Sequence, residues 1–533
     1  MKQKISKYTW LVLIFTLVVS VLYPSLPVKS QTSTQYYVAT NGSDSNPGTQ
    51  SAPWKTIQKA MNSATAGSTV NIKGGTYYEI LNVNVSGTAG AYITFRNAPS
   101  ETAIIDGKGD IASGDVRGII NINNKNYLKF IGLHLTNHVG GYIPGGFIVT
   151  GSSNNIEFRD GKITHIDWAS NSTICPGQGT QYSTPIRIMG GSNIIIDNNE
   201  VFNNNTGDSE SITVDGNVNG FTISNNTIYG HPNIGIDVLG HGAGSQPKGG
   251  LITRNHIYSG SYFCWSGGIY IDGGTDTIIE NNYIHDNWWG IEVGSENSYG
   301  ASNIIVRNNI VFNNSNWGIL VGAHAGVASN IRVYNNVIVN NPDGNLEINS
   351  NLATNSIFKN NIIYSSNGGS LLSGNVGSNI LDYNLWYSTG GGTKPSQDSH
   401  GIFADPKFVK LPGSKFSTIV PDFRLQSGSP AINAGTTLSE ATKDYDGVNR
   451  PVGSAFDIGA YEYGGTSGST PPPTPTPTVL KGDLNNDRIV NSLDWSIMNS
   501  RWFTNDTTAD LNTDGIVNSL DFSILNSNWL KQI

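Results

Sequence analysis

Four carboxylates recur on successive repeats in the middle of the chain and are the first candidates for chemistry. They lie in six short alternating segments: 185–189 (PIRIM), 211–215 (SITVD), 235–239 (GIDVL), 268–272 (GIYID), 290–294 (GIEVG) and 318–322 (GILVG). In a strand the apolar second and fourth residues would face the core, so the third and fifth would face solvent. The outward acids are Asp215, Asp237, Asp272 and Glu292, the acidic strip. Clustered acids repel one another unless a proton, a cation or a reaction uses them, so the strip indicates acid–base catalysis or Ca²⁺ binding.

Stacking these strands predicts two outward columns. The third places hold Arg187, Thr213, Asp237, Tyr270, Glu292 and Leu320, and the fifth places hold Met189, Asp215, Leu239, Asp272, Gly294 and Gly322. Asp215 and Asp237 differ by one coil and two residues, so their Cα atoms should lie ~8 Å apart. Asp237 and Glu292 share a column two coils apart, near ~10 Å. An inverting glycoside hydrolase needs an acid and a base ~6.5–9.5 Å apart, so the strip suits that chemistry.

The tail of the chain carries a second set of acids with metal-ligand spacing. From residue 482 it reads GDLNNDRIVNSLDWSIMNSRW, and a near copy, ADLNTDGIVNSLDFSILNSNW, begins at residue 509. Oxygen donors at positions 1, 3, 5, 7 and 12 of such a loop are what Ca²⁺ requires. The first copy supplies Asp483, Asn485, Asp487, the carbonyl of Ile489, and Asp494; the second supplies Asp510, Asn512, Asp514, the carbonyl of Ile516, and Asp521. We therefore expect two calcium ions here, each followed by a helix.

A repeat positions the acidic strip. Segments such as 219–231 (NGFTISNNTIYGH) and 302–314 (SNIIVRNNIVFNN) recur with a period of about 27 residues and carry an Asn-Asn pair or its equivalent. Their alternating Ile and Val residues predict short strands with one buried face. Parallel stacking of such units gives a β-solenoid whose coils rise by ~4.8 Å. Asparagine at one corner should then stack on asparagine in the neighbouring coils.

Composition excludes several classes of protein. Only 13% of the 533 residues are charged and the net charge is −8, so we expect no nucleic-acid partner, which would need a basic face. Two cysteines exclude a disulfide-dense scaffold, although Cys175 and Cys264 lie in insertions beside the strip, where a disulfide is one option and free thiols the other. The 63 glycines are typical of many tight turns.

The ends of the chain predict its organisation. Residues 1–30, with three early lysines and an apolar run at 10–22, are typical of a signal peptide cleaved near Ser30. We expect a secreted, extracellular protein with no membrane span. Residues 31–463 then form the catalytic β-helix domain. Residues 464–478 (GGTSGSTPPPTPTPT) form an extended linker, and residues 479–533 form the calcium-binding domain.

Both domains resemble known families. The opening, 36–79, and the close, 401–463 with FADPKFV and DIGAYEY, are similar to segments of right-handed β-helix proteins related to the family-nine polysaccharide lyases. The doubled half-hand resembles a type I dockerin. The fold implied is all-β, a right-handed parallel β-helix solenoid of the pectate-lyase-like superfamily, with a small α-helical dockerin.

The dockerin resemblance implies attachment to a scaffolding protein. Its partner would be a cohesin module, and its setting a cellulosome that degrades plant cell-wall polysaccharide. The residues implied for cohesin binding are Ser492, Leu493, Asn499 and Ser500, with Ser519, Leu520, Asn526 and Ser527 in the second copy. Near-identity of the copies implies that either could bind, in poses related by a two-fold rotation.

The β-helix resemblance implies, first, a Ca²⁺-dependent pectate-type lyase acting by β-elimination. Asp215, Asp237 and Asp272 would hold a cleft Ca²⁺, with Arg187 or Lys248 as the base. Family-nine lyases carry a DDGxD-type run, however, and at 233–237 this chain has NIGID, in which only Asp237 matches. An inverting glycoside hydrolase, polygalacturonase- or hemicellulase-like, that uses the same face is a close alternative. A non-catalytic carbohydrate-binding solenoid is a third.

Aromatic residues beside the strip are candidates for stacking on sugar rings. Trp265, Trp288, Trp289 and Trp317 precede the outward strands, where they would either stack on sugars or fill buried corners. Tyr270 lies in the third column, and His241 lies in a Gly-His-Gly sequence that resembles a polygalacturonase motif. Together with Trp265, Trp289 and Trp317 these form the predicted substrate-binding set.

Overall fold

The computed structural model describes residues 33–110, 117–140, 143–168, 182–240, 242, 244–260, 266–417, 419–465, 481–484, 490–506, 508–512 and 515–529. The predicted signal peptide and residues 466–478 of the predicted linker lie outside these ranges. So do Cys175, Cys264, Trp265 and His241, and the predicted calcium ligands Asn485, Asp487, Ile489 and Asp514.

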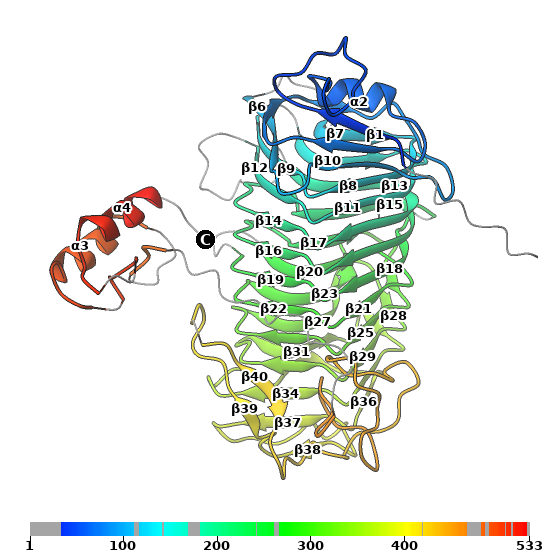
Figure 1. Cartoon of the computed structure of the whole chain (residues 1–533). Helices are drawn as coiled ribbons and strands as arrows, with labels where there is room; N and C mark the ends of the chain where they lie inside the picture. The colour runs from blue at the N-terminus through cyan, green and yellow to red at the C-terminus, as the bar shows by residue number, and fades with distance from the viewer. Residues whose placement is uncertain are drawn as a thin grey trace, which may run out of the picture. The chain divides into compact units, whose positions relative to one another are not determined.

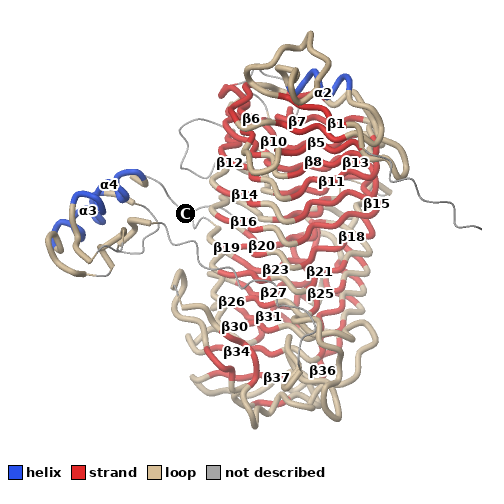
Figure 2. Tube along the Cα trace, in the orientation of Figure 1, coloured by secondary structure: helices blue, strands red, loops and turns tan. Residues whose placement is uncertain are grey.

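Parallel strands stack coil upon coil into a β-helix, as the repeat predicted (Figures 1 and 2). Each full coil contributes one strand to each of three faces. Face 1 contains β4 (Leu81–Asn82), β7 (Arg117–Asn123), β10 (Pro144–Thr150), the first halves of β13 (Thr184–Asp197) and β15 (Ile212–Ser224), β17 (Ile236–Leu239), β20 (Gly267–Asp272), β23 (Trp289–Ser295), β27 (Trp317–His324), β31 (Gly344–Asn349) and β35 (Leu372–Asn375). All six segments predicted to carry the outward columns belong to this face.

The other two faces complete each coil. Face 2 contains β1 (Gln35–Val38), β2 (Thr69–Ile72), β5 (Ile93–Asn97), β8 (Asn126–Ile131), β11 (Asn154–Arg159), the second halves of β13 and β15, β18 (Lys248–Thr253), β21 (Ile278–Glu280), β25 (Ile305–Arg307), β29 (Arg332–Tyr334), β33 (Ile357–Lys359) and β36 (Ile380–Asp382). Face 3 contains β3 (Gly75–Tyr78), β6 (Ala103–Asp110), β9 (His134–Val139), β12 (Lys162–Asp167), β14 (Glu200–Phe202), β16 (Thr227–Tyr229), β19 (His256–Tyr258), β22 (Tyr283–His285), β26 (Ile310–Phe312), β30 (Val337–Val339), β34 (Ile362–Ser365), β37 (Leu385–Ser388) and β38 (Ile402–Phe403). Short strands β24 (Ala301–Ser302), β28 (Ala328–Ser329) and β32 (Ala353–Thr354) form a small sheet at a turn.

The interior of the solenoid is filled by aliphatic side chains from all three faces. On face 1 the second and fourth residues of each segment are fully buried, as in Ile236 and Val238 of β17 and Ile269 and Ile271 of β20. The predicted direction of the alternation is therefore confirmed. At the first coils, α2 (Ile57–Ser63) is N-capped by Thr56 and buries Ile57, Ala60 and Met61, so a short amphipathic helix closes this end of the core.

One corner of the solenoid is built from stacked asparagines. The rungs, which we call the asparagine ladder, are Asn199, Asn226, Asn255, Asn282, Asn309, Asn336, Asn361 and Asn384. In each step the backbone N–H and the Nδ2 of one rung both donate to Oδ1 of the next, as from Asn255 to Asn282 at 3.0 Å each. The residue before a rung is left-handed, as at Asn225 with φ 56° and Asn281 with φ 56°, and asparagine tolerates that conformation well. The paired asparagines of the repeat thus have different tasks: the first makes the turn and the second makes the ladder.

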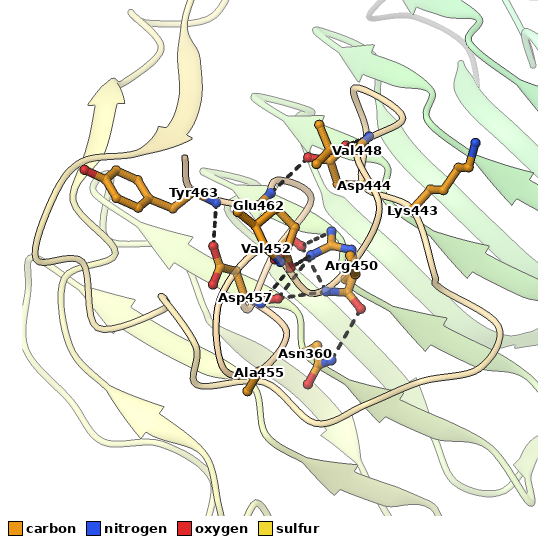
Figure 3. A network of polar contacts seen from close by, with 12 residues as sticks. Asn360, Lys443, Asp444, Val448, Arg450, Val452, Ala455, Asp457, Glu462 and Tyr463 are labelled. Atoms are coloured by element: carbon orange, nitrogen blue, oxygen red, sulfur yellow. Dashed lines mark hydrogen bonds and ion pairs between the residues drawn. The ribbon is translucent and has the colours of Figure 1, made fainter. Parts of the chain in front are cut away.

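The segment after β38 folds back onto the outside of face 3. Its antiparallel strands β39 (Phe408–Lys410) and β40 (Asp422–Leu425) pack Phe408 and Phe423 against Phe312 of β26. Figure 3 shows the polar network that fixes the rest of this segment. The fully buried Arg450 donates to Glu462 Oε1 at 2.7 Å and to the carbonyl of Gly459 at 2.9 Å. Burying this charge pair is tolerable because both partners are hydrogen-bonded.

The tail contains two short helices, α3 (Ser492–Ser500) and α4 (Ser519–Ser527). Asn491 and Asn518 cap them, and each helix has a reciprocal capping box that involves Asp494 or Asp521. A small core of their own joins them, with Val490, Met498, Val517 and Leu525 fully buried. The predicted helices after each loop are therefore present.

Candidate functional site

The predicted outward columns exist as registered strand pairs. Arg187 pairs with Thr213, Thr213 with Asp237, Asp237 with Tyr270, Tyr270 with Glu292, and Glu292 with Leu320. In the fifth column Met189 pairs with Asp215, Asp215 with Leu239, and Asp272 with Gly294. The four acids of the strip therefore occupy four successive coils of face 1.

The strip is not open to solvent, which corrects the expectation that its outward positions face water. Asp215 is 4% exposed, Asp237 and Asp272 are 3% exposed, and Glu292 is 2% exposed. Segments from the loops at the ends of the strands cover part of this face. Glu296, for example, donates its backbone N–H to Asp272 Oδ1 at 2.6 Å. Buried carboxylates resist ionisation, and burial raises the pKa values of Asp237, Asp272 and Glu292, so this face is not a hydrated acidic surface.

Arg187 and Asp215 form an ion pair at the first coil of the strip. Arg187 donates from Nε at 3.1 Å and from a terminal nitrogen at 2.5 Å, both to Asp215 Oδ2. A guanidinium held by a carboxylate keeps its proton and acts as a fixed positive charge. The role predicted for Arg187 as a proton-abstracting base is therefore a poor match to its surroundings.

Glu210 is a fifth carboxylate beside the strip, half-buried, and sequence reasoning missed it. Its Oε2 accepts hydrogen bonds from Thr213 Oγ1 at 2.8 Å and from Ser209 Oγ at 3.3 Å. Burial raises the pKa of Glu210 above its usual value, although these hydrogen bonds oppose the shift. Glu210 directly precedes the alternating segment 211–215, so a search that included the residues flanking each strand would have found it.

Asp237 has the most strongly perturbed environment of the strip. Burial raises its pKa well above the usual range, and the negative charges of Glu210, Asp272, Glu296 and Asp215 raise it further. Within the described residues, its Oδ1 has no hydrogen-bond partner. A buried polar atom left unpaired is costly, which points to a ligand, a substrate or water as its partner. Asp237 is therefore a carboxyl whose ionisation is disfavoured, and it has one buried oxygen without a partner among the described residues.

Asp272 and Glu292 differ in their partners. Burial raises the pKa of Asp272, and the backbone N–H of Glu296 partly opposes the shift. Burial also raises the pKa of Glu292, whose Oε1 lies 3.0 Å from Nε2 of His324. The same hydrogen bond raises the pKa of His324, which is half-exposed. Sequence reasoning missed His324 because it ends β27, two residues beyond the segment 318–322.

The aromatic residues occupy places other than those expected. Trp289 is 6% exposed and packs with Tyr270 and Ile234, so its predicted role as an exposed stacking platform is wrong. It fits because its partner on the preceding coil is Gly267, where a Cβ would lie 2.2 Å from the indole Nε1. Trp288 and Trp317 are half-buried against this cluster. Tyr270 is 2% exposed, and among described residues its hydroxyl has no hydrogen-bond partner.

A groove of about 640 Å³ adjoins the strip at Asp215. Its lining comes from the corner where β13 and β15 pass from face 1 to face 2, and it includes Met189, Gly216, Asn217, Asn219 and Lys248. Lys248 is exposed and begins β18 of face 2, so it lines the same groove as Asp215 without belonging to the outward columns. The groove is polar and could hold a sugar unit next to Asp215, but Asp237 does not line it.

A calcium ion held by the strip alone receives no support from this geometry. Among the described residues, no three or more His, Cys, Asp or Glu side chains are grouped so that they could hold a metal ion. Asp215 is already paired with Arg187. The predicted set of Asp215, Asp237 and Asp272 is therefore a row along the face and not a converging shell.

Family models match three parts of the chain. Residues 36–234 match "Pel9A-like, right handed beta helix region", residues 242–351 match "Right handed beta helix region", and residues 481–529 match "Dockerin type I domain". The chain is a right-handed β-helix protein with a C-terminal type I dockerin. The Pel9A-like match ends at residue 234, so it includes Asp215 of the strip but not Asp237, Asp272 or Glu292.

Two curated proteins and one solved structure illustrate what the β-helix resembles. "Uncharacterized protein YwoF" of Bacillus subtilis is 31% identical over 299 residues, 53% of this chain and 63% of that protein. "Pectate lyase PEL9" of Emericella nidulans is 39% identical over 130 residues, 22% of this chain and 30% of that protein. The chain thus spans less than two thirds of either relative. The structure titled "The complex structure of XylC with xylose" has a TM-score of 0.55 at 14% identity, covering 81% of this chain and 98% of that one, which shows a shared fold.

In the dockerin, the two position-twelve aspartates are buried and shape the loops. Asp494 accepts from Leu484 N at 2.7 Å and from Asn491 N at 2.9 Å, and Asp521 accepts in the same way from Asn512 N at 3.0 Å and Asn518 N at 2.8 Å. Each carboxylate therefore ties the start of its helix to the start of its loop. The described members of the predicted ligand sets are Asp483, Asp494, Asp510, Asn512, Ile516 and Asp521. Their oxygen donors fit a hard cation such as Ca²⁺.

The residues predicted to bind cohesin lie at the exposed ends of the two dockerin helices. Leu493 and Leu520 are each 59% exposed, which is unusual for leucine and equal in the two copies. The remaining predicted residues are also exposed where the structure describes them: Ser492, Asn499, Ser500, Ser519 and Asn526. The side chain of Ser527 is not among the described ones.

Within the described residues, no helix combines the length and apolar character needed to cross a membrane.

Proposed function

We propose that the β-helix is a polysaccharide-cleaving enzyme in which the buried carboxylates around Asp237 act on a glycosidic bond. The observation that carries this proposal is the buried row of acids on face 1. It includes Asp237, whose pKa is raised by burial and by neighbouring acids and whose Oδ1 has no partner within the described residues. A purely structural column has no use for such a cluster, whereas acid catalysis requires a carboxyl that keeps its proton near neutral pH.

Hydrolysis fits these surroundings best. A glycoside hydrolase needs one carboxyl that donates a proton to the leaving oxygen and a second that assists water. Burial supplies the first kind of group at Asp237 and Asp272, because each has a raised pKa. Arg187, with its carboxylate partner, balances charge at one end of the row.

Lyase chemistry is the second candidate. It is favoured by the Pel9A-like match of residues 36–234 and by the relative named "Pectate lyase PEL9". In that case Ca²⁺ would neutralise a uronate carboxylate, and Lys248 would be a better base than Arg187 because it is exposed and has no ion-pair partner among the described residues. Asp237, Asp272 and Glu292, however, lie beyond the Pel9A-like match, which ends at residue 234, and they favour hydrolysis.

The two chemistries differ in their products. The purified protein would be incubated with pectin, polygalacturonate and xylans, with calcium or with chelator. We expect new reducing ends without the ultraviolet absorbance of an unsaturated sugar, and no loss of cleavage in chelator. Calcium-dependent formation of an unsaturated product would establish the lyase instead, and no product from any substrate would contradict both.

The dockerin supports a second part of the proposal, which concerns location. We propose that Ca²⁺ binds both loops of the dockerin, and that Leu493 or Leu520 with the neighbouring helix residues docks into a cohesin module of an extracellular scaffolding protein. The ions would link the loops to the helices through Asp494 and Asp521, so chelation should abolish cohesin binding. Cohesin binding that survives chelator would contradict the calcium role, and retained activity on soluble substrate would show that the β-helix works independently.

A further inference from the structure

The loop 295–300 follows β23 and projects exposed groups beside the buried strip. Glu296 and Tyr299 are exposed, and Tyr299 keeps 47% of its surface open. The Tyr299 ring passes Gly242, where a Cβ would come within 4.0 Å of the phenol carbon and oxygen. One exposed carboxylate and one exposed ring thus lie on the same short loop.

The loop is held in place by three neighbouring coils. Its own Glu296 N–H is bonded to Asp272, and Asn297 Nδ2 donates to the carbonyl of Gly240. Gln246 Nε2 donates to the carbonyl of Gly300 at 2.8 Å. On the other side, the carbonyl of Ser295 accepts from Ala325 N and Gly326 N, both at 2.9 Å. On the loop itself these bonds come from backbone groups and the Asn297 amide, so the side chains of Glu296 and Tyr299 take no part in them.

The carboxylate of Glu296 lies close to every group at this end of the strip. Its negative charge raises the pKa values of Asp237, Asp272 and Glu292, and also that of His324. Sequence reasoning overlooked it because it lies two residues beyond the segment 290–294. Among the carboxylates that surround Asp237, Glu296 is the exposed one.

An independent observation marks the same place as a binding site. The hydroxyl of Tyr270, 2% exposed, is influenced by Glu292, Asp272, Asp237 and Glu296, yet has no hydrogen-bond partner among described residues. Asp237 Oδ1, on the adjacent coil, is unpartnered in the same way. Two buried polar atoms without partners, on residues paired in register between neighbouring coils, indicate that a ligand is to be bound beside them.

We propose that loop 295–300 completes the active centre: Glu296 is a catalytic residue that meets the reacting sugar from the solvent side, and Tyr299 stacks on a neighbouring pyranose ring. This inference rests on the proposed glycosidic cleavage. In the reaction, the buried carboxyl of Asp272 gives its proton to the glycosidic oxygen as the bond between that oxygen and the anomeric carbon breaks. A water oxygen bonds to the anomeric carbon, and Glu296 takes the proton that this water loses.

The test compares four variants of the full chain on whichever polysaccharide of the pectin, polygalacturonate and xylan panel the wild type cleaves. Glu296→Gln should lower kcat by at least ~10²-fold with little change in KM, and should remove the acidic limb of the pH profile. Glu296→Ala should be equally slow and partly restored by added formate, which can replace a missing base. Tyr299→Ala should raise KM by roughly fivefold to tenfold, and Tyr299→Phe should not, because the ring remains.

Two matched controls separate these effects from general damage. Glu347 lies in the same outward column, two coils beyond Glu292, and accepts from Ser373, so Glu347→Gln should leave kcat unchanged. Tyr78, 60% exposed on face 3, is the control for ring loss. Thermal unfolding should not change in Glu296→Gln, because none of the bonds that hold the loop among the described residues comes from its side chain.

The outcomes distinguish this inference from the proposed function. Near-wild-type activity in Glu296→Gln, with Asp237→Asn inactive, would overturn the inference and leave the proposed function standing. A slow Glu296→Ala variant that formate does not rescue, with an unaltered pH profile in Glu296→Gln, would mean a structural role and would also overturn it. If the wild type neither cleaves nor binds any of the polysaccharides, the proposed function fails and the inference fails with it.

Discussion

The asparagine ladder and the acidic strip are both columns of buried polar side chains repeated coil after coil, yet they satisfy their hydrogen bonds very differently. Asn282 Oδ1 accepts two hydrogen bonds from Asn255, and its Nδ2 donates to Asn309 and to the carbonyl of Ile252, each at about 3.0 Å. Asp237, equally buried, has four acidic neighbours and one oxygen without a partner among described residues. The polar groups of the ladder are therefore paired and stabilise the fold, while the strip contains carboxyl groups whose ionisation is unfavourable.

Replacing an asparagine of the ladder by aspartate, and an aspartate of the strip by asparagine, tests this contrast. The largest effect on stability should come from the ladder. Asn282→Asp keeps the shape and both accepted bonds but turns the Nδ2 donor into an acceptor, which then faces Asn309 Oδ1 and the carbonyl of Ile252. A buried charge without a compensating partner should lower the free energy of unfolding by about 3 kcal/mol or more at neutral pH. Chemical denaturation checks this, and a variant as stable as the wild type would contradict the ladder's role.

The reverse substitution in the strip should affect activity instead. Asp237→Asn keeps the shape and removes the ionisable group, so activity should fall by at least ~10²-fold, the usual scale for loss of an acid–base residue. Stability should stay the same or increase, because a destabilising charge is gone. Initial rates on a cleaved polysaccharide and denaturation curves measure the two effects. A variant that lost stability but kept its activity would place Asp237 with the ladder and not with the site.

The sequence predicted what depends on the repeat and missed what depends on loops. The period and the Asn-Asn pairs predicted the solenoid, and alternation predicted which residues of each face 1 segment point outward, because both follow from local geometry. Burial of the strip was not predictable, since it comes from distant contacts such as that of Glu296 N with Asp272. The position of Trp289 likewise depends on Gly267, one coil away. The alternation also failed to identify three residues of the site, Glu210, Glu296 and His324. They flank the alternating segments, where the sequence has no periodicity from which a side chain's direction could be predicted.

A pH series sharpens the comparison further. The pKa of Asp237 is raised in the folded state, so its ionisation costs stability at high pH. That cost shrinks as pH falls below the folded pKa and is gone near the unfolded pKa. The stability gained by Asp237→Asn should therefore be largest at alkaline pH. It should shrink by on the order of 1 kcal/mol per pH unit as the wild-type carboxyl takes up its proton.

The difference between the two proteins is the quantity to measure in this series. Buried histidines such as His231, whose pKa is lowered to about 4 mainly by burial, destabilise both proteins as pH falls, and they cancel in the difference. Denaturation of wild type and variant at about pH 6, 7, 8 and 9 provides the data. A difference that stayed flat across this range would mean that folded Asp237 ionises below it, which would contradict a strongly raised pKa.

The smallest effect is expected from the same substitution at an acid that belongs to neither column. Asp276 is exposed, has φ 49°, and its Oδ1 accepts from Asn303 Nδ2 at 2.9 Å, while the equivalent places on the next coils are Asn303, Asn330 and Asn355. Asp276→Asn keeps the acceptor and a residue type that tolerates left-handed backbone, so the free energy of unfolding should change by less than about 0.5 kcal/mol. Activity should equal that of the wild type, because Asp276 lies at a turn between β20 and β21, outside the strip. If Asp276→Asn lost activity as Asp237→Asn does, removing any acid would suffice, and the unpaired, buried state of Asp237 could no longer be the feature that distinguishes the strip from the ladder.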